Sequence, residues 1–162
     1  MNRLSRVAVA AALASMSAVA FSQGAGGPPS PEAQAKSAIE TRQGLFKLIS
    51  NQMGPIGGML RNQREFDAAL VAKNAARIQT LADMAPELFM NDTRQFKATK
   101  TAALDGIWTS QADFKAKADG LSKAAGATAD AAKTGDKAAT LKAAAEIGKA
   151  CGACHDNFRA KP

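Results

Sequence analysis

Apolar residues recur at alternating intervals of three and four along four stretches of the chain, which is the spacing of amphipathic helices. In the first stretch, Ser30 is the predicted N-cap and Pro31 takes the first helical position. We expect Pro55, which has glycines near it on both sides, to kink or interrupt this helix near its end. The stripe contains one charged residue and consists of Ile39, Arg42, Phe46, Ile49, Met53, Ile56 and Leu60.

Three further helices are predicted, over roughly 65–84, over about 105–133 and from Gly135-Asp136 to near the chain end. Residues 86–104 have no sustained period and form a long connection. Four amphipathic helices with one long crossover predict an all-α antiparallel four-helix bundle. The three stripes are Leu70, Asn74, Ile78, Leu81; Ile107, Gln111, Phe114, Ala118, Leu121, Ala125, Ala132; and Leu141, Ala144, Gly148, Cys151, His155, Phe158.

The first 22 residues have a basic start, an uncharged apolar run and a small-residue end, which is typical of a cleaved secretory signal peptide. A membrane anchor is the alternative, but the run is somewhat short for a span. Residues 23–30 form a flexible leader, and 31–162 form the bundle. Without Arg3 and Arg6 the formal charge falls from +7 to +5. These charges are spread along the chain, which does not favour nucleic-acid binding.

The composition of the chain excludes several further classes of protein. The 162 residues include 38 alanines, eight aromatics, two cysteines and one histidine. Two cysteines exclude a disulfide-rich scaffold, one histidine excludes a multi-histidine metal site, and few β-branched residues argue against a β-sandwich. Because such small side chains fill a core poorly, we expect another group to occupy it.

Residues 151–155 read Cys-Gly-Ala-Cys-His, the attachment signature of c-type haem. On a helix, Cys151, Cys154 and His155 project to one side, so two thiols can hold the haem while the imidazole ligates its iron. A redox dithiol would sit near a helix N-terminus in a βαβ context, and a zinc site would need a fourth ligand. A plain disulfide is the remaining alternative.

The position of this motif near the chain end resembles the class II c-type cytochromes, within them the cytochrome c′ family. The resemblance extends to Arg42-Gln43-x-x-Phe46, Leu88-Phe89 and Ile107-Trp108, and covers nearly all of 31–161. It implies an antiparallel four-helix bundle with haem between the helices. It further implies that the protein is exported to the periplasm. It also implies a homodimer formed through the first two helices. Leu45 and Leu48 lie off the predicted stripe, either for that contact or for a wider core face.

The resemblance also implies roles for single residues. Cys151 and Cys154 form the thioethers, His155 is the proximal ligand, and Arg159 lies beside its imidazole. Arg42 meets a haem propionate, which would explain a charge on an apolar stripe; the alternative is a buried stem with a solvated head. The further implied haem contacts are Gln43, Phe89 and Thr101.

Phe46 matches the family position that faces the iron on the side opposite His155. A phenylalanine cannot ligate iron, so we expect five-coordinate, high-spin iron that binds NO or CO, with electron transfer to an unidentified redox partner as a further role. Met53, on the same stripe, is the alternative sixth ligand of a low-spin His/Met electron carrier. A peroxidase-like enzyme is disfavoured because no histidine or arginine is expected beside the open iron face.

Overall fold

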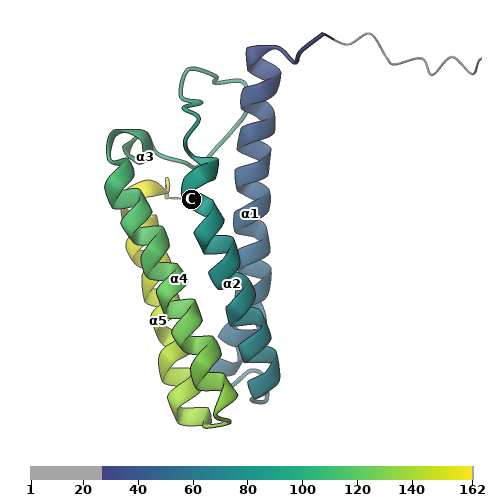
Figure 1. Ribbon diagram of the computed structural model, residues 1–162, viewed down its shortest axis with the longest axis vertical. Helices are drawn as coiled ribbons and strands as arrows, with labels where there is room; N and C mark the ends of the chain where they lie inside the picture. The colour runs from purple at the N-terminus through teal and green to yellow at the C-terminus, as the bar shows by residue number, and fades with distance from the viewer. Residues whose placement is uncertain (1–26, 162) are drawn as a thin grey trace, which may run out of the picture.

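The computed structural model describes residues 27–161, so the predicted signal peptide and residues 23–26 of the leader lie outside it. Four long helices run alternately up and down the molecule, with α1 beside α2 and α4 beside α5 (Figure 1). Within the described residues no helix is long and apolar enough to cross a membrane. The predicted all-α bundle is confirmed. The helices are α1 Pro31–Leu60, α2 Ala68–Leu88, α3 Gly106–Thr109, α4 Gln111–Lys133 and α5 Lys137–Phe158.

Side-chain caps begin three of the long helices. Ser30, Asp67 and Asp136 each accept a hydrogen bond from the backbone N–H three residues on, at 3.2, 2.9 and 3.0 Å. Each bond satisfies one of the N–H groups that have no partner in the first turn. The N-cap predicted at Ser30 is therefore confirmed, and Asp67 begins α2 later than the sequence suggested.

The expected interruption at Pro55 does not occur, because α1 continues through it to Leu60. A proline removes a single helical N–H, and the carbonyl that would have received it belongs to the exposed Asn51. In the same turn, the Asn74 side chain donates to the Gln52 carbonyl at 3.1 Å and ties α2 to α1. Likewise α2 runs past its predicted end and includes Pro86 in its last turn.

The predicted third helix is broken in two at Ser110, whose backbone lies outside the helical region at φ −137° and ψ 50°. The short piece α3 precedes this break and α4 follows it. The break turns α3 away from the axis of α4, across the upper end of the bundle in Figure 1. It places the buried Ile107 against the aromatic residues described below.

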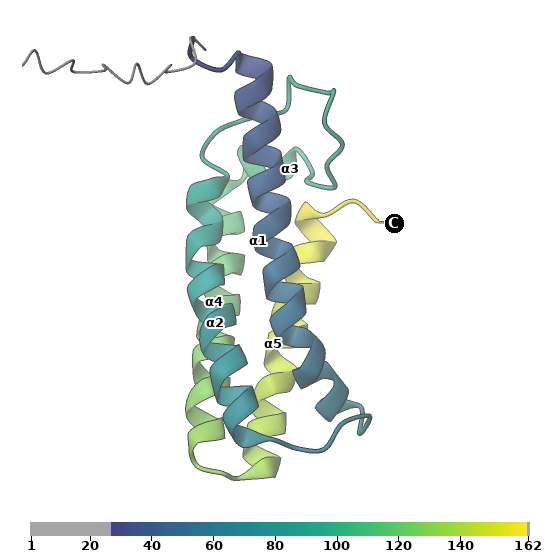
Figure 2. The ribbon, with the colours of Figure 1, turned by 90° about the vertical axis from the view of Figure 1, so that its right-hand side faces the viewer.

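The core has two parts with different side chains. The larger is built mainly of alanine, isoleucine and leucine, and α2 packs most extensively against α4 within it. The smaller lies near the crossover end and consists of Phe89, Ile107, Phe114 and Phe158. Helices α1 and α5 touch each other little, although they lie on the same side of the bundle (Figure 2). Room therefore remains between them.

Candidate functional site

A cavity of about 480 Å³ lies between α1 and α5 and reaches inward to α2 and α4. This volume lies within the range of pockets that enclose an organic cofactor. Alanines of the larger core part form its inner wall where bulkier residues would fill it, among them Ala82, Ala85 and Ala118. All nine predicted site residues lie on the wall: Arg42, Gln43, Phe46, Phe89, Thr101, Cys151, Cys154, His155 and Arg159.

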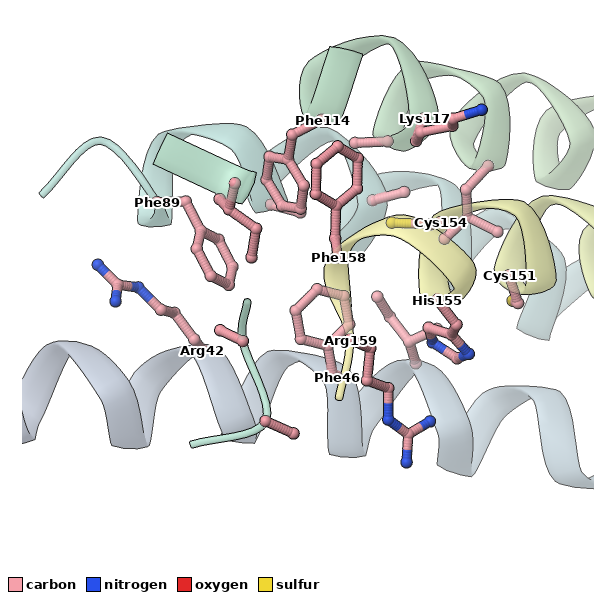
Figure 3. A pocket seen from close by; sticks show the side chains of 18 of the residues that line it. Arg42, Phe46, Phe89, Phe114, Lys117, Cys151, Cys154, His155, Phe158 and Arg159 are labelled. Carbon is pink, nitrogen blue, oxygen red and sulfur yellow. The ribbon is translucent and has the colours of Figure 1, made fainter. Parts of the chain in front are cut away.

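The motif residues lie together on α5, which is unbroken from Lys137 to Phe158. Cys151 and Cys154 are half-buried and form no disulfide with each other. Burial raises the pKa of both thiols, so they are held as neutral thiols at neutral pH. Figure 3 shows both cysteines and the imidazole along one stretch of α5 beside the cavity.

The His155 ring is exposed on the cavity wall and has Arg159 one turn further along the chain. Partial burial, and then the positive charge of Arg159, lower the pKa of this imidazole, while Asp156 acts in the opposite direction. A neutral imidazole is the form that ligates a metal. The surroundings of His155 therefore favour the state that a proximal ligand needs.

The wall formed by α1 contains Phe46 and, two turns on, Met53. Phe46 is 37% exposed, whereas its neighbour Leu45 is 5% exposed and packs in the core. Leu45 therefore belongs to a wider core face, which is one of the two alternatives left open by the sequence, and Phe46 faces the cavity beside Phe89. Leu48, at 53% exposure, remains outside the core.

Aromatic rings close the upper end of the cavity. Phe89 lies 4.9 Å from Phe114 and 6.2 Å from Phe46 between ring centroids. Phe114 meets Phe158 edge-on at 5.4 Å. Phe114, Phe158 and the stem of Lys117 were not among the predicted contacts, although the helical spacing had placed both phenylalanines on inward stripes. Figure 3 shows the two rings facing each other between α4 and α5.

The guanidinium of Arg42 is buried and holds the start of the crossover loop. Its Nε donates to the Leu88 carbonyl at 2.8 Å, Nη1 donates to the Thr93 hydroxyl at 2.8 Å, and Nη2 donates to the Asn91 carbonyl. Only 4% of the residue is exposed, so the alternative of a solvated head is wrong. Burial lowers the pKa of Arg42, but an arginine stays charged at neutral pH.

Trp108, together with Arg42, holds the start of the crossover loop in place. Its indole N–H donates to the Asn91 carbonyl at 3.3 Å. The guanidinium carbon of Arg42 lies 5.5 Å from the Trp108 ring centre, and that of Arg94 lies 5.9 Å from it. These cation–π contacts hold the loop between α1 and α3.

Gln43 and Thr101 contact the far end of the same loop. The Gln43 side-chain amide donates to the Lys100 carbonyl at 2.9 Å, and the Thr101 hydroxyl accepts from the Ala103 N–H at 3.1 Å. Ala103 in turn lies opposite Arg159 in an isolated antiparallel bridge. The loop therefore forms part of the cavity wall and connects α1 with the end of α5.

These residues fit a haem. A large apolar cavity, rings at one end, and two thiols with an imidazole on one helical face are what a covalently held porphyrin needs. The buried Arg42 also has two N–H hydrogens beyond the three that donate within the protein. The implied contact of Arg42 with a haem propionate stays a prediction, because here the guanidinium contacts the loop and the rings of Phe89 and Trp108.

The family model for cytochrome c′ matches residues 37–159. The cytochrome c′ of Rubrivivax gelatinosus is 39% identical over 124 residues, which are 76% of this chain and 95% of that protein. Its crystal structure superposes with a TM-score of 0.69 at 38% identity, covering 77% of this chain and 96% of that chain.

Two further comparisons agree. Cytochrome c-554 of Cereibacter sphaeroides is 32% identical over 129 residues, 79% of this chain and 84% of that protein. A nitric oxide complex of a mutant cytochrome c prime from Alcaligenes xylosoxidans has a TM-score of 0.68 at 27% identity, over 78% of this chain and 97% of that chain.

Proposed function

The chain belongs to the cytochrome c′ family and binds one haem c covalently through Cys151 and Cys154; from this we propose that it is a five-coordinate haem protein that binds small gases. His155 is the proximal ligand, and Arg159 places a positive charge beside it. The haem supplies an iron at which NO or CO binds and one electron is gained or lost. The chain's own residues decide which side of that iron stays open.

The observation that carries five-coordination is the composition of the wall opposite α5. At the family position that faces the iron stands Phe46, whose ring has no donor atom. Around it lie Ile49, Ala82, Ala85 and Phe89, all apolar. An apolar wall solvates no charge, so uncharged diatomic molecules enter more favourably than anions. The nitric oxide complex of the Alcaligenes xylosoxidans relative supports this choice of ligand.

Met53 supports a second candidate, the six-coordinate His/Met electron carrier. Its side chain is half-buried and lines the same cavity as His155. A thioether is a good haem ligand, and its coordination would make the iron low-spin. The two candidate functions therefore differ in whether Met53, on the α1 wall of the cavity, ligates the iron.

Absorption spectra of the ferric and ferrous holoprotein decide between them. We expect a high-spin ferrous spectrum that shifts when CO or NO is added. A low-spin ferrous spectrum with sharp visible bands and no change on adding CO would rule out five-coordination. It would then favour Met53 or another sixth ligand.

We further propose a periplasmic location after removal of residues 1–22, and a non-enzymatic role in binding gas, with electron transfer to an unidentified partner as a further role. The signal peptide predicted from the sequence and the covalent haem support export. A homodimer through α1 and α2 is also part of the proposal. The exposed Leu48 on α1 and Met84 on α2 are available for it, whereas the buried Leu45 is not.

A further inference from the structure

The C-terminal end of α5 is fixed by a segment far from it in the sequence. Residues 102–104 of the crossover loop run antiparallel to residues 158–160. The Leu104 N–H donates to the Phe158 carbonyl at 3.0 Å, and the Ala160 N–H donates to the Ala102 carbonyl at 2.8 Å. Arg159, which lies between these two bonds, is therefore held by the loop.

The same loop segment is fixed from its other side by α1. The bond from Gln43 to the Lys100 carbonyl fixes the position of residue 100, and the Thr101 hydroxyl closes the turn that leads to Ala103. Hydrogen bonds, together with the loop backbone between them, thus link α1 through residues 100–104 to Phe158 and Ala160, the two neighbours of Arg159. This path crosses from one wall of the cavity to the other.

The side chain of Arg159 has no such support of its own. Over residues 27–161 its guanidinium makes no ion pair and no hydrogen bond, and the residue is exposed. Its backbone N–H donates to the His155 carbonyl at 3.2 Å, and its extended backbone (φ −123°, ψ 129°) turns the chain away from the helix. Where this charge lies relative to the imidazole therefore depends on the position of the backbone at residue 159. Figure 3 shows the side chains of Arg159 and His155 near each other at the end of α5.

We propose that Gln43 and Thr101 are positioning residues for Arg159. They act across the cavity through the antiparallel bridge between residues 102–104 and 158–160. Direct contact with haem is then not their only role. The inference rests on the proposed function, because the place of Arg159 matters through the iron that His155 ligates. A fixed cation near that iron favours the ferrous over the ferric state. Releasing the bridge lets the backbone at Arg159 move away from His155, and the effect of the charge weakens with distance.

The variant Ala160→Pro tests the bridge alone, because it removes one of the two hydrogen bonds of the bridge and leaves the side chains of Gln43, Thr101 and Arg159 unchanged. Proline at position 160 removes the N–H that donates to Ala102 and little else. It also requires an extended backbone at the preceding residue, which Arg159 already has. Lys161→Pro is the matched control, because within the described chain the Lys161 N–H donates to no protein acceptor.

Two measurements on the holoprotein report the outcome. Amide hydrogen exchange at Leu104 shows whether the bridge has opened, independently of haem chemistry. The reduction potential shows whether Arg159 has moved. We expect Ala160→Pro to speed exchange and lower the potential in the same direction as Arg159→Gln, a change on the order of a few-fold in the reduction equilibrium. Lys161→Pro should change neither.

A double variant and a second pair of substitutions complete the test. In the Arg159→Gln background, Ala160→Pro should leave the potential where Arg159→Gln set it, because both changes act through one charge. Gln43→Met and Thr101→Val should each lower the potential by a smaller amount. Gln34→Met is the control, since Gln34 on α1 makes the same kind of bond, to the carbonyl of Pro29 before the helix, and does not line the cavity.

The proposal is wrong if neither Ala160→Pro nor Gln43→Met changes the potential, or if their shifts persist in the Arg159→Gln background. The failure of the proposed function is distinguishable, because it would show in the unsubstituted protein. There, a low-spin ferrous spectrum that does not change when CO is added would be seen before any variant is made.

Discussion

Arg42 lies over the ring of Phe89, with its guanidinium carbon 4.7 Å from the ring centre. Arg42 belongs to α1 and Phe89 directly follows α2, and both residues line the cavity. The charge that interrupts the apolar stripe of α1 therefore serves two purposes. It holds the loop that follows α2, and it packs on the ring that closes the cavity.

Replacing Arg42 with methionine should destabilise the holoprotein by about 2–4 kcal/mol. The reason is that the carbonyls of Leu88 and Asn91 and the hydroxyl of Thr93 lose their donor together. Urea unfolding measures the loss. Arg77→Met is the control, since Arg77 makes one long surface bond, 3.3 Å to Gln52, and should cost less than about 0.5 kcal/mol. Equal losses of stability in the two variants would contradict the role of Arg42 in holding the loop.

Phe46→Met should move the ferrous iron toward the low-spin state. The substitution places a thioether at the position proposed to face the iron, and a thioether ligates haem well. The visible spectrum and the loss of CO binding report the change. Phe46→Leu, which has no donor atom, should remain high-spin. An unchanged spectrum in Phe46→Met would show that this residue does not face the iron.

Met53→Leu separates the two candidate functions. If Phe46 faces the iron, exchange of one apolar side chain for another of similar volume leaves the spin state unchanged and costs less than about 1.5 kcal/mol. A conversion from low-spin to high-spin iron in this variant would instead identify Met53 as the ligand.

The two cysteines should be replaceable one at a time without complete loss of covalent haem. Cys151→Ala and Cys154→Ala each leave one thiol on the same face of α5, so each keeps one thioether. The double variant keeps none. Intact mass under denaturing conditions measures the bound haem, and haem retained covalently by the double variant would contradict the assignment.

His155 should titrate below its ordinary pKa in the haem-free chain. Because burial and Arg159 favour the neutral ring, the folded chain binds fewer protons than the unfolded one between the lowered pKa and about 6.5. Stability from this group is therefore complete above about pH 6.5 and lost as the pH falls through that window. NMR follows the sole histidine directly, and Arg159→Gln should raise its pKa.

Most of the helical framework could be predicted because the signals are local. Ser30 and Asp136 carry their own capping groups, and the periodic stripes indicate which faces turn inward. The motif at Cys151 is equally local, since three residues within one turn specify its chemistry. These local signals do not depend on the tertiary contacts of the helices.

What escaped prediction depends on contacts between distant segments. Both Leu45 and Phe46 fit the three-four spacing, and only the cavity beside α1 decides that Phe46 stays partly exposed. Nothing near Ser110 marks the break between α3 and α4, which follows from docking Ile107 and Trp108 on the loop. Two of the three partners of Arg42 are backbone carbonyls, 46 and 49 residues away, and backbone groups carry no sequence signal.

The cavity walls have a consequence for the order of maturation. Cys151, Cys154 and His155 are neighbours in any conformation of the chain, but the cavity exists only once segments from residue 42 to residue 159 have docked. In the folded chain the thiols are already partly covered. Attachment is therefore easiest on an open chain, and a tethered porphyrin then gives the collapsing helices a large apolar surface to gather around. In this protein the prosthetic group therefore joins the chain before collapse and acts as an early part of the hydrophobic nucleus.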